Sequence, residues 1–298
     1  MLNKTQKDDL HASETNSPSH YVGIGASAGG LEAIETFFKH MPSGSNLAFI
    51  VVQHLSPDHK SLMVELLSKR TDMEVLRAED GMAVEANHVY LIPPKKELTI
   101  FHGKLLLKDQ DHEHRINLPI DIFLRSLAED QAEKAVAIIL SGTGSDGTRG
   151  VRAIKEANGM VMIQLEDTAR FDGMPKAAIA TGVADFILPP EQMPVQLLAY
   201  AKHPLESGKN RSAASVDRED GLTKIFAELR EKTRVDFTFY KPSTITRRIE
   251  RRIAVTQSSD IDQYTHYLTE HPEEVTALYR ELLIGVTSFF RDPAVWKV

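Results

Sequence analysis

The sequence predicts an α/β protein with a doubly wound, mostly parallel sheet, followed by a small all-α domain. Over 21–202, short apolar runs of strand length alternate with segments whose apolar residues recur at helical spacing, as in βαβ units. From residue 221 onward every periodic segment is helical. The intervening stretch is rich in Pro, Ser, Gly, Lys and Asn and has no apolar period, as in linkers. The predicted parts are a flexible tail (1–20), the α/β domain (21–202), a linker (203–220) and the all-α domain (221–298).

The strands of the predicted sheet are apolar runs bounded by turn residues. Three of them are almost continuously apolar, which is typical of parallel strands buried on both faces. Two shorter ones end near Pro93 and Gly103, where a turn is favoured. The predicted strands lie at 21–26, 47–54, 89–93, 98–102, 135–140 and 160–164.

Helices are predicted where apolar residues recur three and four positions apart. In the α/β domain they separate the buried strands, and for that reason the sheet is expected to be mostly parallel. These helices lie at 29–38, 61–67, 120–130 and 148–158. In the all-α domain the same spacing predicts helices at 222–233, 244–254, 261–269 and 273–284.

Composition excludes several classes of protein. A content of 42% hydrophobic and 26% charged residues excludes disorder of the whole chain, and a net charge of −7 argues against a general nucleic-acid binder. The absence of cysteine removes disulfides, Cys-ligated zinc and a thiol nucleophile. No apolar run reaches the roughly 18 residues of a membrane span, and the first residues form no secretory signal. A cytoplasmic location is therefore expected.

The glycine-rich segment at 23–30 fits two functional motifs. As G-x-G-x-x-A, starting at Gly23, it is close to the dinucleotide-binding fingerprint, in which glycines let a pyrophosphate approach a helix N-terminus. As G-x-S-x-G, centred on Ser27, it is close to a nucleophile turn, in which small neighbours allow a sharp bend that exposes the hydroxyl. A tight strand-to-helix turn without chemistry is the third interpretation.

A histidine and an aspartate favour the nucleophile interpretation. A dinucleotide site expects an acidic residue at the end of the second strand, whereas this strand ends at His54. Asp146 follows the strand predicted at 135–140. Because the carboxyl ends of parallel strands line one edge of a sheet, Ser27, His54 and Asp146 are expected to meet there. Together they are the side chains that acyl transfer uses.

Each residue of this triad has a defined chemical role. Ser27 is the nucleophile and His54 its general base, while Asp146 orients the imidazole and stabilises the imidazolium. The backbone N–H groups of Ala28 and Thr143 are the candidate oxyanion donors. Interpretations without catalysis also exist: a helix N-cap for Ser27, a hydrogen-bonded strand end for His54 and an Asx turn for Asp146.

Four motifs resemble, in order, those of the CheB-type chemotaxis methylesterase domain: Gly25-Ala-Ser-Ala-Gly-Gly30, Val52-Gln-His54, Leu140-Ser-Gly-Thr-Gly-Ser-Asp-Gly147 and Phe171-Asp-Gly-Met-Pro175. The resemblance covers about 21–201. It implies a doubly wound α/β fold that hydrolyses glutamate γ-methyl esters of chemoreceptors and releases methanol, with deamidation of receptor glutamines as a related activity. Ser27, His54 and Asp146 fall on the catalytic triad of that family. No counterpart of the family's phosphorylatable receiver domain is expected before Tyr21.

Arginines are concentrated on one predicted helix of the all-α domain. Ile245, Ile249 and Ile253 form an apolar stripe, and the basic residues surround Glu250. A solvated charged face is the usual explanation of such a run. Four arginines within six positions nevertheless predict a local site for an acidic partner, formed by Arg247, Arg248, Arg251 and Arg252.

The segments Lys241-Pro-Ser-Thr-Ile-Thr-Arg-Arg-Ile-Glu-Arg-Arg252 and Val286-Thr-Ser-Phe-Phe-Arg-Asp-Pro293 resemble the N-terminal all-α domain of CheR-type receptor methyltransferases. The resemblance covers about 221–298. It implies that the basic helix faces the receptor and that Thr287 and Arg291 are a remnant of an S-adenosylmethionine site. Because no strand-rich cofactor domain follows, we expect no methyl transfer by this chain and no cofactor.

These expectations define the partners. The methylated cytoplasmic domain of a chemoreceptor is the expected substrate, other chemotaxis signalling proteins are expected partners, and neither nucleic acid nor a metal ion is expected. The competing hypothesis is a non-catalytic receptor-docking module.

Overall fold

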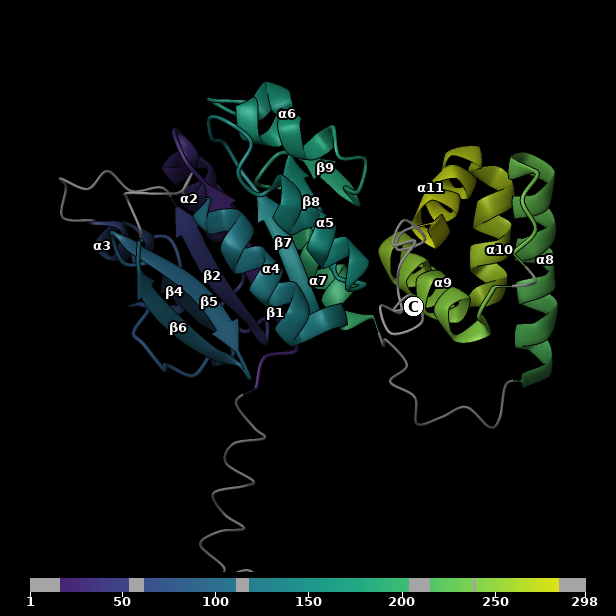
Figure 1. Cartoon of the computed structure of the whole chain (residues 1–298), viewed down its shortest axis with the longest axis horizontal. Helices are drawn as coiled ribbons and strands as arrows, with labels where there is room; N and C mark the ends of the chain where they lie inside the picture. The colour runs from purple at the N-terminus through teal and green to yellow at the C-terminus, as the bar shows by residue number, and fades with distance from the viewer. Residues whose placement is uncertain (1–16, 54–61, 111–117, 204–214, 238–239, 284–298) are drawn as a thin grey trace, which may run out of the picture. The chain divides into compact units, whose positions relative to one another are not determined.

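The chain divides into two compact units, Met1–Leu198 and Ala199–Val298. The computed structural model describes residues 17–53, 62–110, 118–203, 215–237 and 240–283 (Figure 1). Each unit is described by itself. Among the described residues, no helix combines the length and the apolar character needed to cross a bilayer.

The first unit is built on a sheet whose seven described strands all pair in parallel. Their order is β3-β4-β2-β1-β7-β8-β9, so strands are added on both sides of β1, and the predicted doubly wound α/β class is confirmed. The strands are β1 (His20–Ala26), β2 (Leu47–Gln53), β3 (Glu74–Arg77), β4 (His88–Leu91), β7 (Ala135–Ile139), β8 (Met160–Gln164) and β9 (Phe186–Leu188). A separate antiparallel hairpin is formed by β5 (Lys96–Phe101) and β6 (Lys104–Asp109).

Helices cover both faces of this sheet. The described helices of the unit are α2 (Gly30–His40), α3 (Met63–Leu67), α4 (Pro119–Gln131), α5 (Thr148–Glu156), α6 (Gly173–Ile179) and α7 (Met193–Lys202), the last extending past the unit boundary. Figure 1 shows α4 and α5 lying across the strands. On the opposite face, Phe37 and Phe38 of α2 pack edge-on against Phe49 of β2. The central strands are buried on both faces, which explains their almost continuously apolar sequences.

Two glycines of β1 let helix α4 approach the sheet closely. A Cβ atom on Gly23 would lie 2.7 Å from Leu124 Cδ2, and one on Gly25 would lie 2.5 Å from Ile120 Cγ2. Both glycines lie within the strand, where they serve helix packing. The dinucleotide interpretation requires them in a phosphate-binding turn, so their position argues against it.

The second unit consists of helices in its described part: α8 (Ser215–Thr233), α9 (Pro242–Thr256), α10 (Ile261–Glu270) and α11 (Pro272–Leu283). Its core contains the predicted stripe of Ile245, Ile249 and Ile253. Helix α8 begins inside the stretch predicted as linker, so that prediction is wrong from residue 215 onward. The first turn of a helix needs no apolar residue and favours acidic ones, which makes it hard to distinguish from a polar linker.

The pH dependence of stability is predicted to involve His20, the first residue of β1. Burial lowers the pKa of this imidazole to about 4, and the positive charge of Lys134 adds to the effect. The folded state then binds its proton only at lower pH than the unfolded state, whose histidine has a pKa of about 6.5. Stability is therefore lost as the pH falls from about 6.5 to about 4, by roughly 3 kcal/mol.

The test compares wild type with His20→Gln by urea denaturation at pH 7 and at pH 4.5. Carboxylates titrate in both proteins, so the difference between their two pH dependences isolates the histidine. The variant should lose less free energy of unfolding on acidification, and equal losses would contradict the assignment.

Candidate active site

Two of the three predicted triad residues, Ser27 and Asp146, follow neighbouring strands at the same edge of the sheet. Strand β1 lies between β2 and β7, with Ala26 paired to Gln53 and Gly25 paired to Ile139. Ser27 follows the end of β1, and Asp146 follows β7 before α5 begins. His54 is next in sequence after Gln53 and lies outside the described residues.

Ser27 occupies a sharp turn between strand β1 and helix α2. Its backbone N–H donates to the Ser141 carbonyl oxygen at 3.0 Å, and its own carbonyl accepts from Gly30 N–H at 3.0 Å. The N-cap of α2 is Gly29, with a left-handed φ of 69°. The interpretation of Ser27 as the helix N-cap is therefore wrong, and the turn has the strand-to-helix geometry that the nucleophile interpretation requires.

Asp146 is buried and held by backbone donors. Its Oδ2 accepts from the Ile120 N–H at 3.0 Å, and its Oδ1 accepts from the N–H groups of Asp121 and Gly147, each at 2.9 Å. Two of these donors belong to the first turn of α4, where unpaired N–H groups and the helix dipole favour an anion. Asp146 is thus fixed by a helix far from it in sequence, which a local Asx turn would not require.

Ser141 ties the serine turn to two other segments, although the sequence analysis gave it no role of its own. Its hydroxyl lies 3.0 Å from the Ala28 carbonyl oxygen and 3.3 Å from that of Phe171, and its Oγ accepts from Phe171 N–H at 3.0 Å. Its backbone N–H donates to Gln164 Oε1 at 2.8 Å. The sequence does carry a signal for this role: Ser141 is a polar residue directly after a fully apolar strand, and a serine buried there needs hydrogen-bond partners.

The glycine-rich loop after β7 approaches the serine closely. A Cβ atom on Gly142 would lie 2.9 Å from Ser27 Cβ and 2.2 Å from Met174 Sδ. Gly142 N–H donates to the Phe171 carbonyl, and its own carbonyl accepts from Met174 N–H. Thr143, whose N–H is a candidate oxyanion donor, follows directly and is exposed. The other candidate donor, the Ala28 N–H, lies in the turn after Ser27, before α2 begins.

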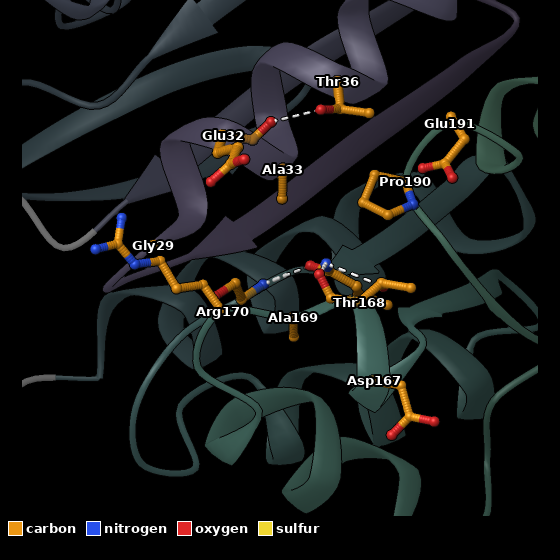
Figure 2. A pocket seen from close by; sticks show the side chains of 12 residues that line it. Gly29, Glu32, Ala33, Thr36, Asp167, Thr168, Ala169, Arg170, Pro190 and Glu191 are labelled. Carbon is orange, nitrogen blue, oxygen red and sulfur yellow. Dashed lines mark hydrogen bonds between the residues drawn. The ribbon is translucent and has the colours of Figure 1, made fainter.

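A cleft of about 440 Å³ adjoins this turn (Figure 2). Gly29 and Ser141 form part of its wall. Its exposed charged residues come from α2, from the segment after β8 and from the segment before α7: Glu32, Asp167, Arg170 and Glu191. Ser27 itself does not line this cleft, which is a polar depression next to the serine turn.

The predicted arginine site of the helical unit is largely buried. Arg248, Arg251 and Arg252 are 6%, 2% and 7% exposed, and only Arg247 among the four is exposed. For Arg248 and Arg252 the physical reason is spacing: positions 245, 248, 249 and 252 follow the i, i+3, i+4, i+7 pattern of an inward helix face. The prediction of a four-arginine surface is therefore wrong.

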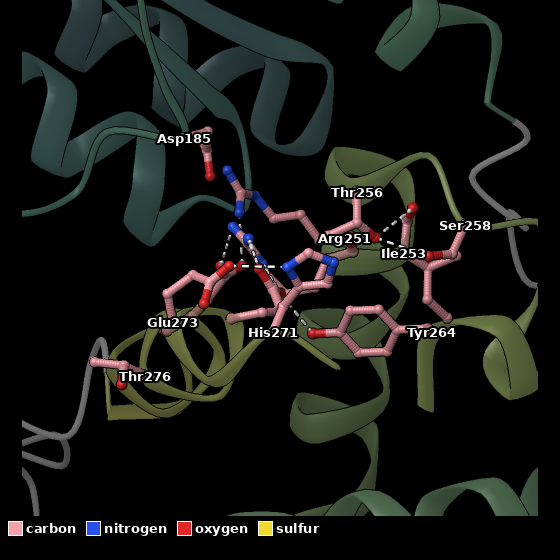
Figure 3. Close-up of polar contacts among 12 residues, drawn as sticks. Asp185, Arg251, Ile253, Thr256, Ser258, Tyr264, His271, Glu273 and Thr276 are labelled. Carbon is pink, nitrogen blue, oxygen red and sulfur yellow. Dashed lines mark hydrogen bonds and ion pairs between the residues drawn. The ribbon is translucent and has the colours of Figure 1, made fainter. Parts of the chain in front are cut away.

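Two of these arginines form ion pairs with helix α11. Arg251 Nη1 lies 2.7 Å from Glu281 Oε1, and Arg252 binds Glu274 through Nε at 2.8 Å and Nη2 at 2.5 Å. Tyr264 of α10 donates its hydroxyl to the same Glu274 at 2.8 Å (Figure 3). Burial chiefly, and then the charge of Glu274, raise the pKa of the Tyr264 phenol. The predicted cofactor-site remnant, Thr287 and Arg291, lies outside the described residues.

The fold is that of a doubly wound α/β protein with a serine in a sharp strand-to-helix turn at the carboxyl edge of its sheet. Residues 22–197 match the CheB methylesterase family, and residues 220–283 match the all-alpha domain of CheR methyltransferases. The chain belongs to the CheB methylesterase family.

Individual proteins are similar to this chain. An uncharacterized 104.1 kDa protein of Rhodobacter capsulatus is 40% identical over 252 residues, which are 78% of this chain and 26% of that protein. A protein-glutamate methylesterase/protein-glutamine glutaminase of Hydrogenovibrio crunogenus is 31% identical, over 64% of this chain and 52% of that protein. The CheB methylesterase catalytic domain of Thermotoga maritima has the same fold, with a TM-score of 0.56 and 32% identity over 60% of this chain and 97% of that structure. The chain thus spans about a quarter of the first relative and about half of the second.

Removing one charge of the buried network is predicted to destabilise the helical unit. Glu281→Gln takes away the carboxylate that faces Arg251, and breaking a buried ion pair by loss of one partner costs about 3–5 kcal/mol. Arg247→Gln is the matched control because this side chain is exposed, and such surface changes cost about 0.5 kcal/mol or less. Urea denaturation of the full chain, followed by circular dichroism, measures both. Equal midpoints for the two variants would show that the pair contributes nothing.

Proposed function

We propose that the α/β unit is a serine hydrolase that removes methyl groups from glutamate γ-methyl esters of chemoreceptors, with deamidation of receptor glutamines as a related activity. The observation that carries this proposal is the Ser27 turn at the edge where Asp146 is also anchored, within a domain that matches the CheB methylesterase family. The relatives named protein-glutamate methylesterase/protein-glutamine glutaminase supply the substrate class.

The proposed reaction follows the logic of acyl transfer. Ser27 Oγ attacks the ester carbonyl carbon while His54 accepts the hydroxyl proton, and the negative charge that develops on the carbonyl oxygen is stabilised by the N–H groups of Ala28 and Thr143. Collapse of this tetrahedral intermediate breaks the bond to the methoxy group, which leaves as methanol with the proton from His54. Asp146 stabilises the imidazolium during these steps.

Water then completes the cycle. The glutamyl ester formed on Ser27 is attacked by a water molecule that gives its proton to His54. The second tetrahedral intermediate releases the receptor glutamate, and the proton returns to Ser27. The sum is one ester and one water converted into one carboxylic acid and one methanol.

The proposed substrate is the methylated cytoplasmic domain of a chemoreceptor, which places this unit in the cytoplasm with other chemotaxis signalling proteins. The helical unit, similar to the all-alpha domain of CheR methyltransferases, is proposed to take no part in the hydrolysis. Three of its four clustered arginines are buried, so docking of an acidic receptor surface would have to use other residues.

Loss of the nucleophile tests this function directly. Ser27→Ala should lower methanol release from a methylated receptor fragment by about 10⁴-fold or more, because the covalent step is removed. Ser145→Ala is the control, since it deletes the hydroxyl of an exposed serine in the loop that precedes Asp146. Undiminished release by Ser27→Ala would reject the assignment, whatever the control shows.

A further inference from the structure

A second carboxylate, Asp121, is buried behind Asp146. It belongs to the first turn of α4 and is 4% exposed, against 3% for Asp146. Its Oδ1 accepts from the Gly150 N–H of α5 at 2.7 Å. The proposed hydrolysis assigns it no step.

The two carboxylates hold the N-termini of two helices in a reciprocal way. Asp146, which precedes α5, accepts from the N–H groups of Ile120 and Asp121 in α4. Asp121, which lies in α4, accepts from the N–H of Gly150 in α5. An anion in α4 and an anion just before α5 therefore each satisfy otherwise unpaired N–H groups at the start of the other helix.

Close packing leaves this arrangement little freedom. A Cβ atom on Gly150 would lie 2.6 Å from Leu124 Cβ, so α5 touches α4 at the residue that donates to Asp121. Gly147, between Asp146 and α5, has a left-handed φ of 97°, and a Cβ atom there would lie 2.7 Å from Ile139 Cδ1. A shift of α5 relative to α4 would therefore pull on the Asp146 carboxylate through the short connection formed by Gly147.

Keeping a carboxylate at this place is costly. Burial raises the pKa of Asp121 most, the Gly150 N–H lowers it, and the negative charge of Asp146 raises it again. Burial and the nearby charge of Asp146 both disfavour a charged Asp121, so the hydrogen bond that this side chain accepts is what offsets them.

We propose that Asp121 is a positioning residue for Asp146: by clamping the N-terminus of α5 onto α4, it fixes the carboxylate that orients the catalytic imidazole. This inference rests on the proposed function, because it assigns Asp121 an effect on that triad. A residue that acts in this way changes turnover more than substrate binding, since displacement of a catalytic group by about 1 Å can cost about 10²-fold in rate.

The test uses the full chain, a methylated receptor fragment and two variants of Asp121. Asp121→Ala should lower kcat by about 10- to 100-fold and leave KM within about twofold. Asp121→Asn keeps an oxygen acceptor for the Gly150 N–H and should recover turnover to within about threefold of wild type. The acid limb of the kcat/KM profile should move to lower pH in Asp121→Ala, because a displaced Asp146 stabilises the imidazolium less.

Asp185→Ala is the matched control. Asp185 also accepts from a backbone N–H, that of Val161 at 2.9 Å, and pairs with Lys155 at 2.6 Å, but it precedes β9 near the amino ends of the strands. Its loss should reduce stability without changing kcat or the acid limb. All assays are run at a temperature at which circular dichroism shows each variant to be folded.

Each outcome decides between explanations. If Asp121→Ala keeps wild-type kcat and pH profile and loses only stability, as Asp185→Ala does, Asp121 is a structural cap and the inference is overturned. If Asp121→Asn is as slow as Asp121→Ala, the hydrogen bond to Gly150 is not what positions Asp146, and the inference is again overturned. Full activity of Ser27→Ala, measured in parallel, would overturn the proposed function together with this inference, whereas an inactive Ser27→Ala with a fully active Asp121→Ala rejects the inference alone.

Discussion

Close packing of helix α4 on strand β1 is the contact on which the candidate site depends. Gly23 and Gly25 remove the side chains that would hold the helix away, and Leu124 and Ile120 occupy the space. The approach brings the first turn of α4 to the carboxyl end of the sheet, where its N–H groups bind Asp146. A larger residue at either glycine would displace the anchor of the carboxylate even though it touches no residue of the proposed triad.

The serine side of the site depends on a different set of contacts. Ser141 and Gln164 connect the ends of β1, β7 and β8, and the Phe171 segment joins them through the Ser141 hydroxyl. Parallel strands end in loops that have no ladder to satisfy their backbone groups, so buried side chains must do so. Ser141 and Gln164 are themselves buried, so the turn that carries Ser27 is held by hydrogen bonds shielded from water, as accurate placement of a nucleophile requires.

The sequence was sufficient for the central strands, for most helices and for the position of Ser27 and Asp146 at the ends of neighbouring strands, because long apolar runs and the order of βα units determine which carboxyl ends meet. It did not reveal β3 and β9, whose four and three residues are too short for a periodic signal. The prediction that the arginines of α9 are exposed was wrong. It followed their charge, whereas their spacing places Arg248 and Arg252 beside the buried isoleucine stripe. Asp121 was hidden for a related reason: an acidic residue in a first helical turn is usually a solvated end group.

The buried carboxylates of the two units are neutralised by different kinds of partner. In the α/β unit, Asp121 and Asp146 are matched with backbone N–H groups whose positions are fixed by helices, so each carboxylate has one well-defined place. In the helical unit, Glu274 and Glu281 are matched with arginines on long side chains that can adapt. Buried Arg–Glu pairs contribute to the choice of which helices pack together more than to net stability. The role proposed for Asp146, the orientation of an imidazole, requires a carboxylate of the first kind, and the reciprocal contacts of Asp121 and Asp146 provide it.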